Sequence, residues 1–127
     1  MLRLPGLVVI ATFSLSMPCI AREFTPCQIA DPDIRASIPD DEVITIRARI
    51  FPTMHSGLVL HDDACEDQSI HMISTSGSKD VDAVANSMIR AEIYDHPTFG
   101  LATGRLHRVG RMEELDAMSL TTAPGQR

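Results

Sequence analysis

The feature that most constrains the fold of this chain is a strict two-residue alternation near its middle. Residues 43–50 read VITIRARI, and Ile44, Ile46, Ala48 and Ile50 fall on one side of an extended chain, opposite threonine and arginine. A period of two is typical of a β-strand with one buried face. The chain is therefore expected to build its core on a sheet.

Four more strands are expected from shorter apolar runs between turn residues. In the fourth of these five strands, Gly100 and Gly104 predict a bulge or a sharp bend. The polar sequence at residues 108–114 predicts a turn before the last strand. The four expected strands lie at residues 57–60, 69–73, 99–106 and 115–120.

Between the third and fourth strands the hydrophobic period changes from two to that of a helix. Ser78 or Asp80 can cap the start of this helix, and Pro97 stops it. We therefore expect one helix over residues 79–94. Its apolar face is Val81, Val84, Ala85 and Met88.

Residues 1–21 predict a cleaved secretory signal peptide. Arg3 supplies a positive charge, residues 7–17 are apolar, and Cys19 and Ala21 place small residues where a signal peptidase reads the chain. The mature protein is therefore expected to be exported, either to the periplasm or out of the cell.

Two alternatives compete with a cleaved signal. A membrane-spanning helix needs about 20 apolar residues, and Pro5 and Pro18 bound a shorter stretch. A lipid anchor on Cys19 would follow unfavourable residues for that cleavage at positions 16–18. We expect no membrane span in the mature chain.

Loss of the signal leaves two cysteines, Cys27 and Cys65, in a compartment where disulfides persist. Two cysteines allow one pairing. A bridge between them would restrict the unfolded chain by about 4 kcal/mol in the loop-entropy model. The stretch from Gly57 to Met72, GLVLHDDACEDQSIHM, is therefore expected to hold a structural disulfide.

The mature chain is acidic. Without Arg3 it carries ten of the eleven basic residues against seventeen acidic ones, so the formal net charge changes from −6 to −7. Nucleic-acid binding depends on a basic face that displaces counterions. Nucleic acid is therefore an unlikely partner, and an unknown protein or a small anionic ligand is expected instead.

The order of three strands, a helix and two strands resembles that of the OB-fold, a small five-stranded barrel. More narrowly, the chain is similar to small exported proteins of proteobacteria that carry a stretch like GLVLHDDAC and a late Thr103-Gly104-Arg105. The resemblance implies a mainly β domain with one helix, an OB-like barrel in the order β-β-β-α-β-β, over residues 42–120. It implies no site.

The ends of the mature chain are expected to lie outside this barrel. Residues 22–41 contain three prolines and four aspartates with little periodicity, and they predict an irregular arm tied down by Cys27. Residues 121–127, TTAPGQR, offer nothing to bury and predict a disordered tail.

A metal site is the alternative function for the region around Cys65. Zinc takes about four ligands from cysteine, histidine and carboxylates, and the chain offers the elements without a recognised spacing. The simpler interpretation is a polar turn with scattered histidines. The candidate ligands are His55, His61, Asp63 and His71.

Catalysis has weaker support. Reactive cysteines need cationic neighbours or a helix N-terminus, whereas Cys65 stands among acidic residues. The acidic pairs at residues 40–41 and 62–63 lack the spacing of a calcium loop and are typical of solvated turns. We expect no enzyme and no cofactor.

A basic patch is the last candidate. Outward-facing residues of the expected barrel could bind an anionic ligand or an acidic partner, by analogy with the binding face of OB-folds. Surface ion pairs with the many acidic residues are the alternative. The patch residues are Arg47, Arg49, His71 and Arg105.

Overall fold

The computed structural model describes residues 21–52, 58–79, 81–83, 86 and 98–124. It is mainly β, with one six-stranded sheet and short helical segments. The expected signal peptide lies outside the described residues.

The stretch expected to be an irregular arm is ordered into regular elements, so that prediction was wrong. Strand β1 (Arg22–Phe24) is followed by helices α1 (Pro26–Ala30) and α2 (Pro32–Ala36). Each helix starts with a proline behind a capping side chain. Proline is favoured at the first position of a helix because its missing N–H has no partner there.

The caps themselves are visible in the structure. The Thr25 hydroxyl accepts a hydrogen bond from the Gln28 amide at 3.2 Å, and the Gln28 side chain accepts one from the Thr25 amide at 2.9 Å. This reciprocal pair is a capping box. At α2, the Asp31 carboxylate accepts from the amides of Asp33 and Ile34.

The five expected strands are all present, with boundaries that differ at some ends. The third is found as expected, and the first is two residues longer. The last two extend well beyond their expected ends. The strands are β2 (Val43–Pro52), β3 (Leu58–His61), β4 (Ser69–Ile73), β5 (Thr98–Val109) and β6 (Met112–Pro124).

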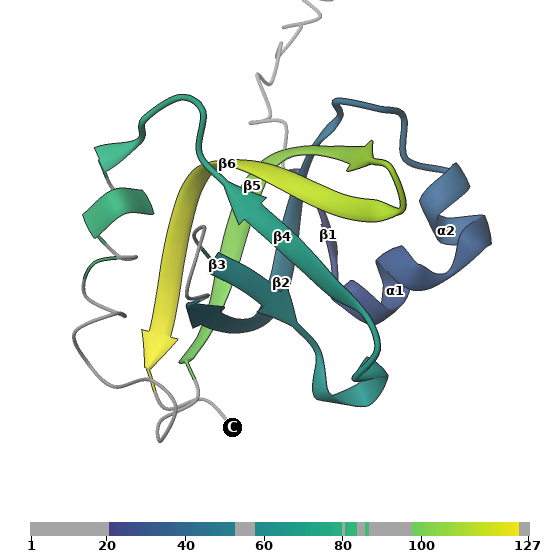
Figure 1. Ribbon diagram of the computed structural model, residues 1–127, viewed down its shortest axis with the longest axis horizontal. Coiled ribbons are helices and arrows are strands. Elements are labelled where there is room, and N and C mark those ends of the chain that lie inside the picture. The colour runs from purple at the N-terminus through teal and green to yellow at the C-terminus, as the bar shows by residue number, and fades with distance from the viewer. Residues whose placement is uncertain (1–20, 53–57, 80, 84–85, 87–97, 125–127) are drawn as a thin grey trace, which may run out of the picture.

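The strands close into a ring of pairings. The order is β2, β3, β4, β6 and β5, and β5 pairs again with β2. All these pairs are antiparallel except β4 with β6. Strand β1 adds a parallel pairing to the first half of β2. Figure 1 shows the strands wrapped around a centre, with α1 and α2 on one side.

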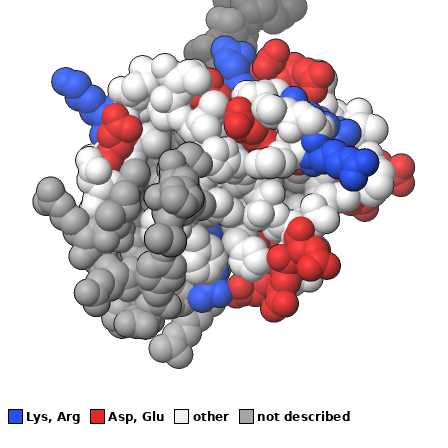
Figure 2. Space-filling view, viewed as in Figure 1, with Lys and Arg blue, Asp and Glu red and all other residues white. Residues whose placement is uncertain are grey.

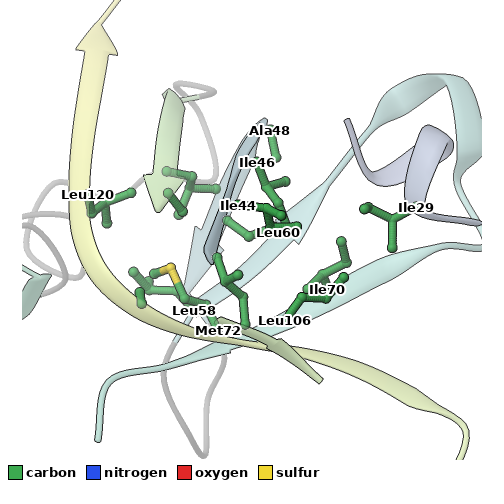
Figure 3. Close-up of a cluster of buried hydrophobic side chains, with 14 of the residues drawn as sticks. Ile29, Ile44, Ile46, Ala48, Leu58, Leu60, Ile70, Met72, Leu106 and Leu120 are labelled. Atoms are coloured by element: carbon green, nitrogen blue, oxygen red, sulfur yellow. The ribbon is translucent and has the colours of Figure 1, made fainter. Parts of the chain in front are cut away.

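The core fills the inside of this ring (Figure 3). The alternation predicted for the first strand is confirmed, because its four inward residues are buried and Arg47 is exposed. Ile70 and Met72 are buried as expected, and Ile29 from α1 joins the same cluster. The arm thus covers part of the core that the sequence assigned to the sheet alone.

The junction between β5 and β6 differs from the expected seven-residue turn. Only Gly110 and Arg111 form the turn, and Gly110 has a φ of 65°, a conformation that favours glycine in two-residue hairpin loops. The residues on either side pair across the hairpin. The predicted tail was also wrong at its start, because residues 121–124 belong to β6.

The bulge predicted in the fourth strand is confirmed at Gly104, where the register between β5 and β6 shifts. Gly100 instead stays in register with Ala48 and Thr122. A Cβ at Gly104 would lie 2.1 Å from the carbonyl oxygen of Asp116. Glycine therefore lets the two backbones approach closely.

The start of the expected helix is confirmed within the described residues. Residues 79, 81–83 and 86 are helical, Ser78 Oγ accepts from the Val81 amide at 3.5 Å, and Val81 is buried in the core cluster. The rest of residues 79–94 lies outside the described part of the chain.

Candidate functional site: a pocket between helix α2 and the β5–β6 hairpin

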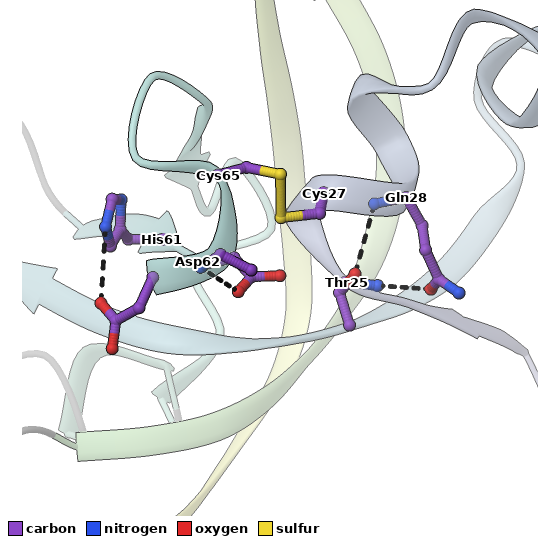
Figure 4. Close-up of a disulfide and its surroundings, with 8 residues drawn as sticks. Thr25, Cys27, Gln28, His61, Asp62 and Cys65 are labelled. Carbon is purple, nitrogen blue, oxygen red and sulfur yellow. Dashed lines mark hydrogen bonds and ion pairs between the residues drawn. A yellow bond between two sulfur atoms is a disulfide. The ribbon is translucent and has the colours of Figure 1, made fainter.

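The predicted disulfide is present. Cys27 of α1 is bonded to Cys65 of the short 3₁₀ helix η1 (Asp63–Cys65), with their Cα atoms 5.5 Å apart (Figure 4). The bond joins the N-terminal arm to the loop between β3 and β4. Since Cys65 is bonded through its sulfur, it carries no free thiolate for nucleophilic chemistry.

Of the candidate metal ligands, His61 and Asp63 lie next to each other. His61 Nε2 lies 3.6 Å from Asp63 Oδ1. His71, on β4, instead lies beside Glu114 of β6. His55 lies outside the described residues. Within the part of the chain that the structure describes, no group of three or more histidine, cysteine or acidic side chains is arranged to hold a metal ion.

Asp63 has a different partner from the one a metal site requires. Its two carboxylate oxygens accept hydrogen bonds from Nη1 of Arg49 at 2.7 and 2.8 Å. The Arg49 guanidinium also lies 5.1 Å from the centre of the Phe51 ring. Asp63 therefore orders the loop next to the disulfide by pairing with the first strand of the ring.

The residues of the predicted basic patch each contact an oxygen of the protein itself. Arg47 pairs with Glu23 at 3.4 Å, Arg49 with Asp63, and His71 Nδ1 lies 3.5 Å from Glu114. Arg105 donates to the backbone carbonyl of Asp41 at 3.2 Å. The contacts of Arg47 and Arg49 are surface ion pairs, as the alternative interpretation expects, whereas that of Arg105 is a hydrogen bond to the backbone. Of the four, Arg105 lies at the edge of the site described next.

The candidate site is an open pocket of about 530 Å³ between the arm and the ring. Basic and acidic side chains lie next to one another on the side of the molecule that carries α1 and α2 (Figure 2). Helix α2 contributes Arg35 and Ala36 to the pocket, the following link contributes Asp40 and Asp41, and β5 contributes His107 and Arg108.

Arg35 is the buried charged residue of this pocket. Its side chain is 7% exposed. Its Nε donates to both carboxylate oxygens of Glu113, at 2.9 and 3.0 Å, and its Nη1 donates to the Ile38 carbonyl at 3.0 Å. A buried guanidinium is stable only when it is paired and hydrogen-bonded in this way. These contacts fix Arg35 at the wall of the pocket.

Glu113 is shared between two arginines. Besides Arg35, it accepts a hydrogen bond from Nε of Arg108 at 2.5 Å. This hydrogen bond, and the negative charge of Glu113, raise the pKa of the Arg108 guanidinium above its ordinary value. Two positive charges thus face one carboxylate, so the cluster of Arg35, Glu113 and Arg108 keeps one net positive charge.

The link after α2 adds two aspartates with different roles. Asp40 lies 3.5 Å from Nη2 of Arg35, and its side chain is 82% exposed. Asp41 has a φ of 65°, the one positive φ at a non-glycine residue in the described chain. Its amide donates to the Leu106 carbonyl at 3.1 Å. Backbone strain of this kind is concentrated at functional sites.

A second cluster lies on the outer face of the sheet next to the pocket. His107 Nε2 lies 2.8 Å from one oxygen of Glu114, and His71 Nδ1 lies 3.5 Å from the other. All three side chains are less than a third exposed. His107 also lines the pocket. His71, which was expected in a basic patch, is therefore one of two histidines that flank the Glu114 carboxylate.

Sequence reasoning did not bring the residues of this pocket together, although two signals were present. Thr25-Pro26 and Asp31-Pro32 are capping residues followed by proline, which would have predicted helices in the arm. A turn centred on Gly110 and Arg111 would have placed Arg108 opposite Glu113, as the structure does. The burial of Arg35 against that pair has no signal in the sequence.

No protein-family model matches this chain, and no curated protein matches it. Among the described residues, no helix has the length and apolar character needed to cross a membrane.

Proposed function

We propose that this protein is a small exported binding module that holds a small ligand in the pocket between α2 and the β5–β6 hairpin. The burial of Arg35 at the pocket wall is the observation that carries the proposal. Burying a guanidinium is costly, and well-packed apolar residues can often replace a buried ion pair without loss of stability. A charge kept at a pocket is better explained by a ligand that it contacts.

The OB-like architecture is part of the same proposal. A closed ring of five strands, with the segment from residue 74 to 97 between its third and fourth members, supports it. So does the parallel pairing of the third strand with the fifth. In OB-folds the loop between the fourth and fifth strands contributes to ligand binding, and the β5–β6 hairpin holds that place here.

Export is the third part of the proposal. The Cys27–Cys65 disulfide supports it, because such bonds persist mainly in oxidising compartments. Intact-mass measurement of the protein recovered from its native host tests this part. We expect a chain that begins at Arg22 and is lighter than the reduced form by two hydrogen atoms, whereas an uncleaved chain or free thiols would contradict export.

Binding is tested with the oxidised chain from residue 22 labelled with ¹⁵N. A library of small acidic, neutral and basic fragments is titrated while amide shifts are recorded. We expect saturable shifts in α2, in the link at residues 38–41 and in β5 near His107. Shifts confined to the strands around Arg47 and Arg49, or no saturable shifts with any fragment, would contradict the proposal.

A pair of tryptophan variants provides the control. Ala36 is exposed and lines the pocket, and Ala83 is exposed in the helix that follows Ser78. A tryptophan at residue 36 would fill the pocket, whereas one at residue 83 leaves it open. We expect Ala36→Trp to abolish fragment binding and Ala83→Trp to leave it unchanged.

A further inference from the structure

We propose that the pocket recognises a carboxylate group of its ligand, and that the Asp40 side chain occupies the carboxylate position when no ligand is bound. This inference rests on the proposed function, since it names the chemical group that the same pocket takes. It makes Asp40 an internal competitor that the ligand displaces from Arg35.

The hydrogen bonds of Arg35 leave one end of its guanidinium available. Nε is committed to Glu113 and Nη1 to the Ile38 carbonyl, both at about hydrogen-bond optimum. Within the described residues, Nη2 contacts only the Asp40 carboxylate, at 3.5 Å. A guanidinium presents its N–H groups in a planar fork that matches a carboxylate. The contact with Asp40 therefore places a carboxylate at the Nη2 end of the guanidinium, where one long contact of 3.5 Å holds it.

Asp40 can leave this position at little cost. Its side chain is 82% exposed, and its contact with Arg35 is its one ion pair among the described residues. At 3.5 Å, and with water competing for the exposed Asp40 carboxylate, this ion pair contributes little. A ligand whose other atoms fill the pocket can therefore replace Asp40 at Arg35.

The charges around Arg35 favour a singly charged ligand. The two arginines and Glu113 leave one net positive charge, which Asp40 neutralises when no ligand is bound and which a monocarboxylate neutralises when it displaces Asp40. Asp41 lies on the same pocket, and its negative charge would oppose the second charge of a phosphate dianion. The ligand class that fits this wall of the pocket is a monocarboxylate whose remaining atoms are apolar or uncharged.

The test uses Asp40→Asn, which removes the competing charge while keeping the size of the side chain. Benzoate, its neutral isostere benzamide and inorganic phosphate are each titrated into the oxidised ¹⁵N-labelled protein, and the Arg35 Nε–H signal reports contact. Asp67→Asn is the matched control, because Asp67 is also exposed but lies in the loop after η1. It removes the same charge at a distance from the pocket.

We expect benzoate to shift Arg35 and the amides of residues 36–41, with weaker or no response to benzamide and phosphate. Asp40→Asn should raise benzoate affinity about two- to five-fold, the range that corresponds to one exposed ion pair, and Asp67→Asn should not. If neutral fragments bind in the pocket as well as benzoate does, or if the two variants behave alike, the carboxylate assignment is wrong while the pocket stands. If nothing binds there, the proposed function itself fails.

Discussion

Replacement of Gly104 by alanine is expected to be the most damaging single-methyl change in the described sheet. A Cβ at this position would lie 2.1 Å from the carbonyl oxygen of Asp116, 2.7 Å from its carbonyl carbon and 2.8 Å from Cα of Ala117. Carbon atoms pack at about 3.5–4.0 Å. All three atoms belong to the backbone of β6, so no side-chain rotation can relieve the overlap.

The strands must therefore separate by about 1 Å, which exceeds the tolerance of the hydrogen bonds beside the bulge. Overpacking costs about 1–3 kcal/mol, and two weakened hydrogen bonds add about 1 kcal/mol each. We expect Gly104→Ala to lower the free energy of unfolding by about 3–5 kcal/mol. Domains of this size have about 5–15 kcal/mol in total.

Urea unfolding of the oxidised protein, followed by circular dichroism, measures this loss. Gly77→Ala is the control, because Gly77 has a φ of 65° and, among the described residues other than its two chain neighbours, no atom lies within 4 Å of the position that an added methyl group would take. Gly77→Ala should cost only the energy of placing alanine in the left-handed backbone conformation, about 1–2 kcal/mol. A Gly104→Ala protein that is no less stable than Gly77→Ala would refute the argument that strand approach requires glycine.

Three further changes test other parts of the fold by the same unfolding measurement. Cys27→Ser with Cys65→Ser should lower the free energy of unfolding by about 4 kcal/mol, because the unfolded chain regains the entropy of a 38-residue loop. Thr25→Ala should cost about 1 kcal/mol through the lost cap of α1. Thr75→Val should destabilise at neutral pH, because the Thr75 hydroxyl and amide hydrogen-bond to Asp116 and lower the pKa of its carboxyl.

The pH dependence of the last variant has a defined sign. A carboxyl whose pKa is lowered by folding stabilises the protein above its unfolded pKa of about 4, and this contribution is lost as the pH falls through the folded value. The stability difference between wild type and Thr75→Val should therefore be full at pH 7 and shrink below about pH 4. It should also be smaller in an Asp116→Asn background, because the Asn oxygen can still accept the hydrogen bond but carries no charge. A difference that persists in acid would assign the effect to something other than this carboxylate.

Local residue patterns were enough to predict several features of the fold. The strand at residues 43–50, the Cys27–Cys65 pairing and the glycine bulge were all predictable, because alternation, a two-cysteine count and a glycine inside a strand are signals that can be read along the chain. The arm was predictable in principle, since Thr25-Pro26 and Asp31-Pro32 are local helix starts. Counting prolines only as helix breakers led to the wrong prediction.

The sequence by itself determined the five strands of the ring and their apolar faces, because hydrophobic period and turn chemistry depend on neighbours along the chain. Only the tertiary structure decided that α2 lies beside the β5–β6 hairpin and places Arg35 against Glu113, 78 positions away. That contact depends on how the closed ring meets the arm. Partner choice for a charged side chain is set by distance in space, and no periodicity along the chain encodes it.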